Sequence, residues 1–124
     1  MTAPRLTGCG TALVTPFNAD GSIDEAALSA LVDWQIEEGI HFLVPCGSTG
    51  EAATMTLEEH CRAVLIVVKQ AKGRVPIVAG AGSNDTKKAI ELSLRMRHPH
   101  WRKMPGTHGL VHWHFDEVSL SSRR

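Results

Sequence analysis

Short apolar runs alternate with amphipathic stretches along the first three quarters of the chain. The runs at residues 10–15, 40–44 and 75–79 are nearly continuous, as is typical of strands buried on both faces. Each run precedes a segment in which apolar residues recur every three or four positions, the last of these at residues 86–94. Three strand–helix units in strict alternation predict an α/β protein with a parallel sheet covered by helices.

Capping signals indicate where the first two helices begin. Ser22 with Glu25, and again Thr56 with Glu59, have the spacing of a capping box, in which each side chain bonds the other residue's backbone N–H. A doubly wound sheet and a (β/α)8 barrel of about 250 residues both use such units, and the pattern alone does not choose between them. In either architecture, ligands bind on the loops that follow the carboxyl ends of the strands.

The character of the sequence changes near Arg95. Residues 1–94 hold 7 basic and 11 acidic side chains, whereas residues 95–124 hold 6 and 2, so the net charge of zero combines −4 with +4. Five of the seven histidines lie in the second part, which shows neither helical nor strand periodicity. We therefore expect a folded α/β part over residues 1–94 and an irregular, basic, His-rich tail over residues 95–124.

Composition excludes several classes of protein. No apolar run approaches the roughly 18 to 20 residues that a membrane span needs, and the N-terminus has no apolar segment of the kind found in secretory signals. Balanced charge gives no sign of a nucleic-acid or membrane partner. The three cysteines form no C-x-x-C motif and leave one thiol unpaired in any disulfide scheme, which favours a reduced, cytoplasmic protein.

The loop Gly47–Glu51, with the sequence G-S-T-G-E, is the richest candidate for chemistry. Two glycines let the backbone turn tightly and expose N–H groups, and two hydroxyls add donors, so the loop suits a carboxylate or phosphate. An ordinary turn whose hydroxyls bond its own backbone is the alternative. In the tail, His98 with His100 and His112 with His114 indicate adventitious metal affinity, so we expect no metal site.

Three motifs together resemble the dihydrodipicolinate synthase family. They are T-A-L-V-T-P-F at Thr11–Phe17, G-S-T-G-E at Gly47–Glu51 and V-P-I-V-A-G-A-G-S-N-D-T-K-K-A-I at Val75–Ile90. The resemblance runs from about Leu6 to Leu94, the N-terminal portion of the family pattern. It implies that this chain holds the first three βα units of a (β/α)8 barrel.

The resemblance also implies an activity and a set of site residues. Members of the family are lyases that condense pyruvate with L-aspartate semialdehyde on the diaminopimelate route to lysine, through a Schiff base on a barrel lysine and without a cofactor. By position, Thr49 resembles the residue that binds the pyruvate carboxylate, together with backbone N–H groups of the loop that begins at Gly47. Ser48 resembles the hydroxyl of the proton relay, and Thr15 resembles a residue that lines the site.

The chain departs from the family pattern where the later parts of the barrel would follow. It contains no tyrosine, so the proton-donor and relay tyrosines of the family are absent. None of its lysines matches the context of the Schiff-base residue: Lys69, Lys72, Lys87, Lys88 and Lys103. We therefore expect no detectable synthase activity from this chain alone. A frameshift near Arg95 is our hypothesis for the change in character, with fusion to an unrelated basic tail as the alternative.

Sister families keep other functions open. N-acetylneuraminate lyases and 2-keto-3-deoxy sugar acid aldolases share G-S-T-G-E, although the third-strand pattern A-G-x-G-S-N resembles the synthases more. A non-enzymatic or pseudogene product is a further alternative. Members of the synthase family often assemble as homotetramers. Three parallel strands of an unclosed sheet leave open edges, so we expect this chain to self-associate or aggregate.

Overall fold

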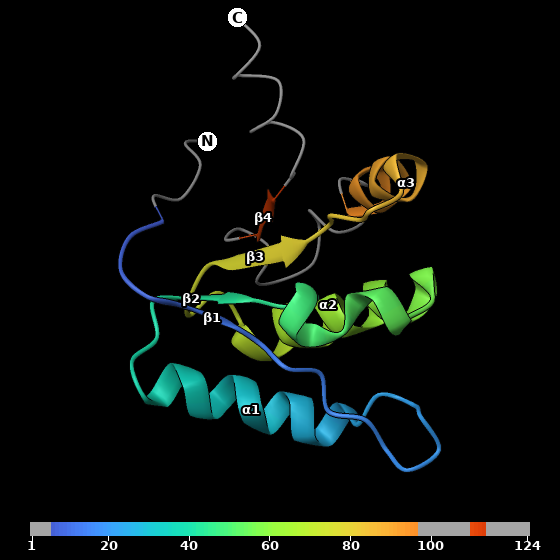
Figure 1. Ribbon diagram of the computed structural model, residues 1–124. Helices are drawn as coiled ribbons and strands as arrows, with labels where there is room; N and C mark the ends of the chain where they lie inside the picture. The colour runs from blue at the N-terminus through green and yellow to red at the C-terminus, as the bar shows by residue number, and fades with distance from the viewer. Residues whose placement is uncertain (1–5, 97–109, 114–124) are drawn as a thin grey trace, which may run out of the picture.

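Four parallel strands form one sheet in the part of the chain that the computed structural model describes, residues 6–96 and 110–113 (Figure 1). Each strand pairs with the next strand along the chain, so the spatial order is β1-β2-β3-β4. The strands are β1 (Gly10–Ala12), β2 (Phe42–Val44), β3 (Ile77–Gly80) and β4 (Leu110–Trp113).

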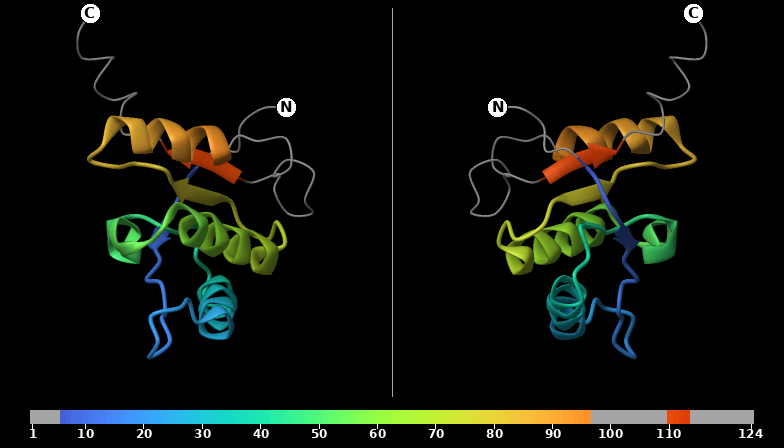
Figure 2. Two further views of the ribbon diagram at one scale, coloured as in Figure 1. Left: turned by 90° about the vertical axis from the view of Figure 1, so that its right-hand side faces the viewer. Right: turned by 90° about the vertical axis from the view of Figure 1, so that its left-hand side faces the viewer.

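A helix follows each of the first three strands, which confirms the three predicted strand–helix units. The helices are α1 (Glu25–Glu37), α2 (Leu57–Ala71) and α3 (Thr86–Met96). They follow one another in space in the same order as the strands, with α2 between the other two (Figures 1 and 2). Two short 3-10 helices, η1 (Ser48–Gly50) and η2 (Ala52–Thr54), lie between β2 and α2.

The core lies between the helices and one face of the sheet. Leu13, Leu43 and Ile77 bring apolar side chains from the first three strand segments into one buried cluster with residues of α1 and α2. Strand alternation points Val14 away from this cluster, and its side chain is 52% exposed. The described part of the sheet therefore buries one face near β1 and leaves an apolar residue open on the other.

The second helix begins as predicted, and the first does not. Thr56 and Glu59 form the capping box of α2: the Thr56 hydroxyl accepts from the Glu59 N–H at 3.2 Å, and the Glu59 carboxylate accepts from the Thr56 N–H at 2.8 Å. The predicted box at Ser22 was wrong, because Asp24 caps α1 by accepting from the Ala27 N–H.

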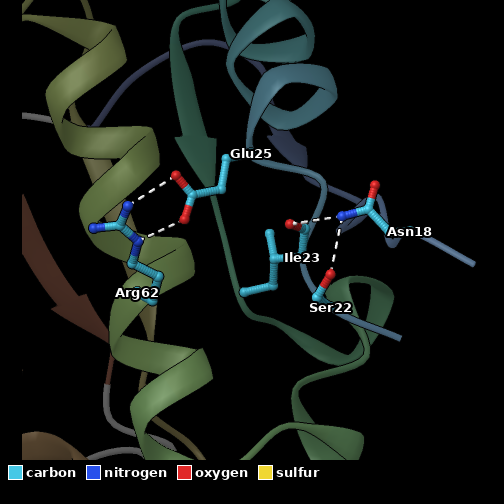
Figure 3. Close-up of polar contacts among 5 residues, drawn as sticks. All are labelled: Asn18, Ser22, Ile23, Glu25 and Arg62. Carbon is cyan, nitrogen blue, oxygen red and sulfur yellow. Dashed lines mark hydrogen bonds and ion pairs between the residues drawn. The ribbon is translucent and has the colours of Figure 1, made fainter. Parts of the chain in front are cut away.

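The turn before α1 explains this correction. The Asn18 amide donates to Ser22 Oγ at 3.0 Å (Figure 3). The Ser22 hydroxyl donates to Asp20 Oδ1 at 2.6 Å, so Ser22 belongs to the turn rather than to the helix. Beyond the turn, Arg62 of α2 donates from two nitrogens to the two carboxylate oxygens of Glu25, at 2.7 and 2.8 Å (Figure 3). This bidentate pair connects the first turn of α1 to α2.

The tail differs from the prediction at both places that the structure describes. Arg95 and Met96, the first two residues of the expected irregular tail, belong to α3. Residues 110–113, which were expected to be irregular, form β4 and pair in parallel with all four residues of β3. Four residues are too few for a periodicity to stand out, whereas an unpaired edge of β3 offers a row of backbone donors and acceptors.

Among the described residues, no helix is both long and apolar enough to cross a membrane.

Candidate functional site

The candidate site lies at the carboxyl ends of the first three strands. The chain leaves β2 through Pro45 and turns at Cys46, whose φ of 57° is left-handed and uncommon for a residue with a side chain. Gly47 returns to an extended conformation, and η1 follows at once. The Gly50 N–H donates to the Gly47 carbonyl at 3.0 Å, which closes the loop predicted from the G-S-T-G-E motif.

The two hydroxyl-bearing residues of this loop are open to solvent. Ser48 and Thr49 are both exposed, and Gly47 is half-buried. Within the described part of the chain, neither side-chain hydroxyl forms a hydrogen bond. The alternative in which the hydroxyls bond their own loop backbone therefore has no support here, and both remain available to a ligand.

Thr15 lies beneath the loop rather than on its open side. Its side chain is buried, and its hydroxyl donates to the Gly50 carbonyl at 2.8 Å. Gly50 has no room for a side chain, because a Cβ there would lie 2.9 Å from the Leu13 carbonyl oxygen. The end of the first strand segment thus supports the loop by close backbone packing and one buried hydrogen bond.

The end of β3 supports the same loop from the other side. The Gly80 N–H donates to the Pro45 carbonyl at 2.9 Å, and a Cβ on Gly80 would lie 2.2 Å from the Cys46 carbonyl oxygen. Sequence reasoning noted the glycines after the third strand only as a tight turn. It missed this contact, because nothing in the local sequence places Gly80 against Cys46.

Two buried side chains behind the loop have shifted acidities. Burial raises the pKa of the Cys46 thiol to about 12, and the charge of the Cys61 thiolate adds to the rise. Burial lowers the pKa of the His60 imidazole; its hydrogen bond to Gly80 acts in the opposite direction, and the charge of Lys88 lowers the pKa further. Both groups are therefore neutral near pH 7.

The burial of Cys46 predicts a graded reactivity of the three free thiols. At pH 8 we expect a disulfide reagent to modify the exposed Cys9 rapidly and the half-buried Cys61 slowly, since burial also raises the pKa of Cys61. Cys46 should react only after unfolding. Peptide mass spectrometry of timed samples measures each rate. Modification of Cys46 as fast as Cys9 in the folded chain would contradict this burial.

The side chains that the described residues bring to this loop are hydroxyl donors: Ser48, Thr49 and Thr15. No group of three or more His, Cys, Asp or Glu side chains among the described residues lies close enough to hold a metal ion. Lys69, Lys87 and Lys88 lie on α2 and α3, and Lys72 ends α2. The histidine pairs of the tail lie outside the described side chains. Exposed hydroxyls on a glycine-bounded turn suit the binding of a small carboxylate.

Parallel strands in the sequential order β1-β2-β3-β4, with a helix after each of the first three, are typical of an α/β-barrel type of protein. The family model described as "Dihydrodipicolinate synthetase family" matches residues 5–101. The chain belongs to this family. A 4-hydroxy-tetrahydrodipicolinate synthase of Maridesulfovibrio salexigens is 63% identical over 86 residues, which are 69% of this chain. The chain spans only 29% of that relative's length.

Solved structures agree with the family and with the predicted partial barrel. The crystal structure of the dihydrodipicolinate synthase from Acinetobacter baumannii complexed with pyruvate superposes with a TM-score of 0.68 at 44% identity, covering 70% of this chain and 30% of that one. An N-acetylneuraminate lyase from Mycoplasma synoviae gives 0.64 at 28% identity, covering 72% and 30%. The fold is therefore the part of a (β/α)8 barrel that the sequence predicted.

Proposed function

We propose that this chain forms the carboxylate-binding part of a 4-hydroxy-tetrahydrodipicolinate synthase, with pyruvate as the ligand of the loop Gly47–Gly50. The observation that carries the proposal is the pair of exposed, unbonded hydroxyls on Ser48 and Thr49 at the carboxyl end of β2. Support comes from the 44% identical structure, which is described as a complex with pyruvate. The sister-lyase alternative is less favoured, because the N-acetylneuraminate lyase is only 28% identical.

In this proposal the residues of the chain bind and orient the substrate. The Thr49 hydroxyl and backbone N–H groups of the loop donate hydrogen bonds to the pyruvate carboxylate, a charge-assisted contact that fixes the direction of the keto group. Ser48 takes part in the proton relay, and Thr15 holds the loop from below through Gly50. Condensation with L-aspartate semialdehyde, for lysine biosynthesis in the cytoplasm, proceeds through a Schiff-base lysine that is not among the lysines of this sequence.

Substitution of Thr49 by valine tests the carboxylate contact. Valine keeps the shape of the side chain and removes the hydroxyl, and a hydrogen bond to a charged group contributes about 1.5–3 kcal/mol. We therefore expect pyruvate affinity to fall by roughly tenfold or more. Pyruvate titrations followed by the backbone amide resonances of residues 47–50 give the dissociation constant.

The matched control is the same change at Thr7, which is exposed and lies before β1, at the opposite end of the strand from the site. Thr7→Val should bind pyruvate as the unmodified chain does. No response of the loop resonances to pyruvate in the unmodified chain would refute the proposed function. Equal affinities of the unmodified chain and Thr49→Val would refute the role of Thr49.

A further inference from the structure

His60 contacts both strand ends that support the candidate site. It is the fourth residue of α2 and its side chain is only 2% exposed. Its imidazole Nε2 lies 2.6 Å from the carbonyl oxygen of Gly80, the last residue of β3. Its own carbonyl oxygen accepts from the Cys46 thiol at 3.7 Å. One residue of α2 thus reaches the end of β3 and the turn that follows β2.

The contact between His60 and Gly80 requires a proton on Nε2. A carbonyl oxygen only accepts hydrogen bonds, so the imidazole must be the donor. Because His60 is buried, it is neutral near pH 7 and carries its single N–H on Nε2. The positive charge of Lys88 on α3 also disfavours the imidazolium form of His60.

Gly80 connects the hydrogen bond of His60 to the loop. Its N–H donates to the Pro45 carbonyl at 2.9 Å, and its Cα packs so closely that a Cβ would meet the Cys46 carbonyl oxygen at 2.2 Å. A left-handed φ is energetically unfavourable for a residue with a side chain such as Cys46, and it persists only where surrounding contacts determine it. Cys46 directly precedes Gly47, so its conformation sets the direction in which the loop leaves β2.

We propose that His60 is a positioning residue for the loop Gly47–Gly50. By donating from Nε2 to the Gly80 carbonyl and accepting the Cys46 thiol on its own carbonyl, it holds the left-handed turn at Cys46. The conformation of this turn orients the hydroxyls of Ser48 and Thr49. The ligand-binding consequence rests on the proposed function, whereas the effect on loop conformation does not.

Two substitutions separate the hydrogen bond from the bulk of the side chain. His60→Gln places an amide N–H near the position of Nε2, and His60→Leu fills similar space without a donor. We expect His60→Gln to keep the amide resonances of residues 46–50, and His60→Leu to shift them and to weaken pyruvate binding by roughly tenfold. His41→Leu is the matched control, because His41 is exposed and lies before β2, and its imidazole accepts one hydrogen bond among the described residues, from the Cys9 N–H at 3.0 Å.

Each outcome bears on a separate part of the inference. Unchanged loop resonances and pyruvate affinity in His60→Leu would overturn it, as would a folded His60→Gln that behaves like His60→Leu. Absence of pyruvate binding in the unmodified chain would refute the proposed function, while the resonances would still test the positioning role. If both variants fail to fold, the nitrogen chemical shifts of the His60 imidazole in the unmodified chain test the inference, because they show which ring nitrogen carries the proton. A proton on Nδ1 rather than Nε2 would overturn the inference.

Discussion

Replacement of Gly80 by alanine should destabilise the chain by about 3 kcal/mol or more, because the new methyl group has no space. A Cβ at this position lies 2.2 Å from the carbonyl oxygen of Cys46 and 3.0 Å from the nitrogen of Gly47. These are backbone atoms of the turn after β2, so they cannot rotate away as a flexible side chain would. The strand end and the loop must separate instead. Urea unfolding followed by circular dichroism gives the change in the free energy of unfolding.

The control for this prediction is Gly47→Ala. No atom lies within 4 Å of a Cβ at Gly47, and its φ of −79° is ordinary for alanine. We expect its stability to lie within about 0.5 kcal/mol of the unmodified chain. A similar loss of stability in both variants would show that the effect arises from loop flexibility and not from the close approach of Gly80 to Cys46.

Truncation of Leu43 to alanine should cost about 2–5 kcal/mol, the range for deleting a large aliphatic side chain from a packed core. Leu43 is fully buried in the central part of the cluster, and its strand pairs with β1 on one side and β3 on the other. The neighbours therefore have little freedom to move into the cavity. The shift in the midpoint of urea unfolding measures the loss in the free energy of unfolding, provided that the slope of this free energy against urea concentration is the same for both proteins.

Val14→Ala is the matched control, because the side chain of Val14 is 52% exposed on the other side of the sheet. Its expected cost is about 0.5 kcal/mol or less. A cost for Val14→Ala as large as for Leu43→Ala would contradict the exposure of the Val14 side chain. It would instead mean that the face around Val14 is covered in solution, as self-association would achieve.

Much of the fold follows from the sequence because short apolar runs between amphipathic segments mark the strands of a βα fold. The runs near Leu43 and Ile77 became β2 and β3, and the helices follow each of them as expected. The predicted helix cap at Ser22 was wrong because the Ser22 hydroxyl bonds Asp20 in the preceding turn. The strand β4 was missed because so short a segment forms a strand only where the edge of another strand is available to pair with it.

The candidate site divides in the same way between local and distant contributions. The loop Gly47–Gly50 was predicted because its glycines and hydroxyls are adjacent in the sequence. The supports beneath it were not, because Cys46, His60 and Gly80 come together only after the strands pair and α2 packs on them. A left-handed cysteine has no sequence signature, since glycine and asparagine are the usual residues in that conformation.

The strand order has a consequence for how the chain assembles during its synthesis. Each described strand pairs only with the one made before it and the one made after it, in the order β1-β2-β3-β4. Among these four strands, no strand made early has to wait for a later one to be inserted between it and its neighbour. Each strand–helix unit can join the exposed edge of the sheet soon after it leaves the ribosome, so the sheet is extended strand by strand from β1 to β4.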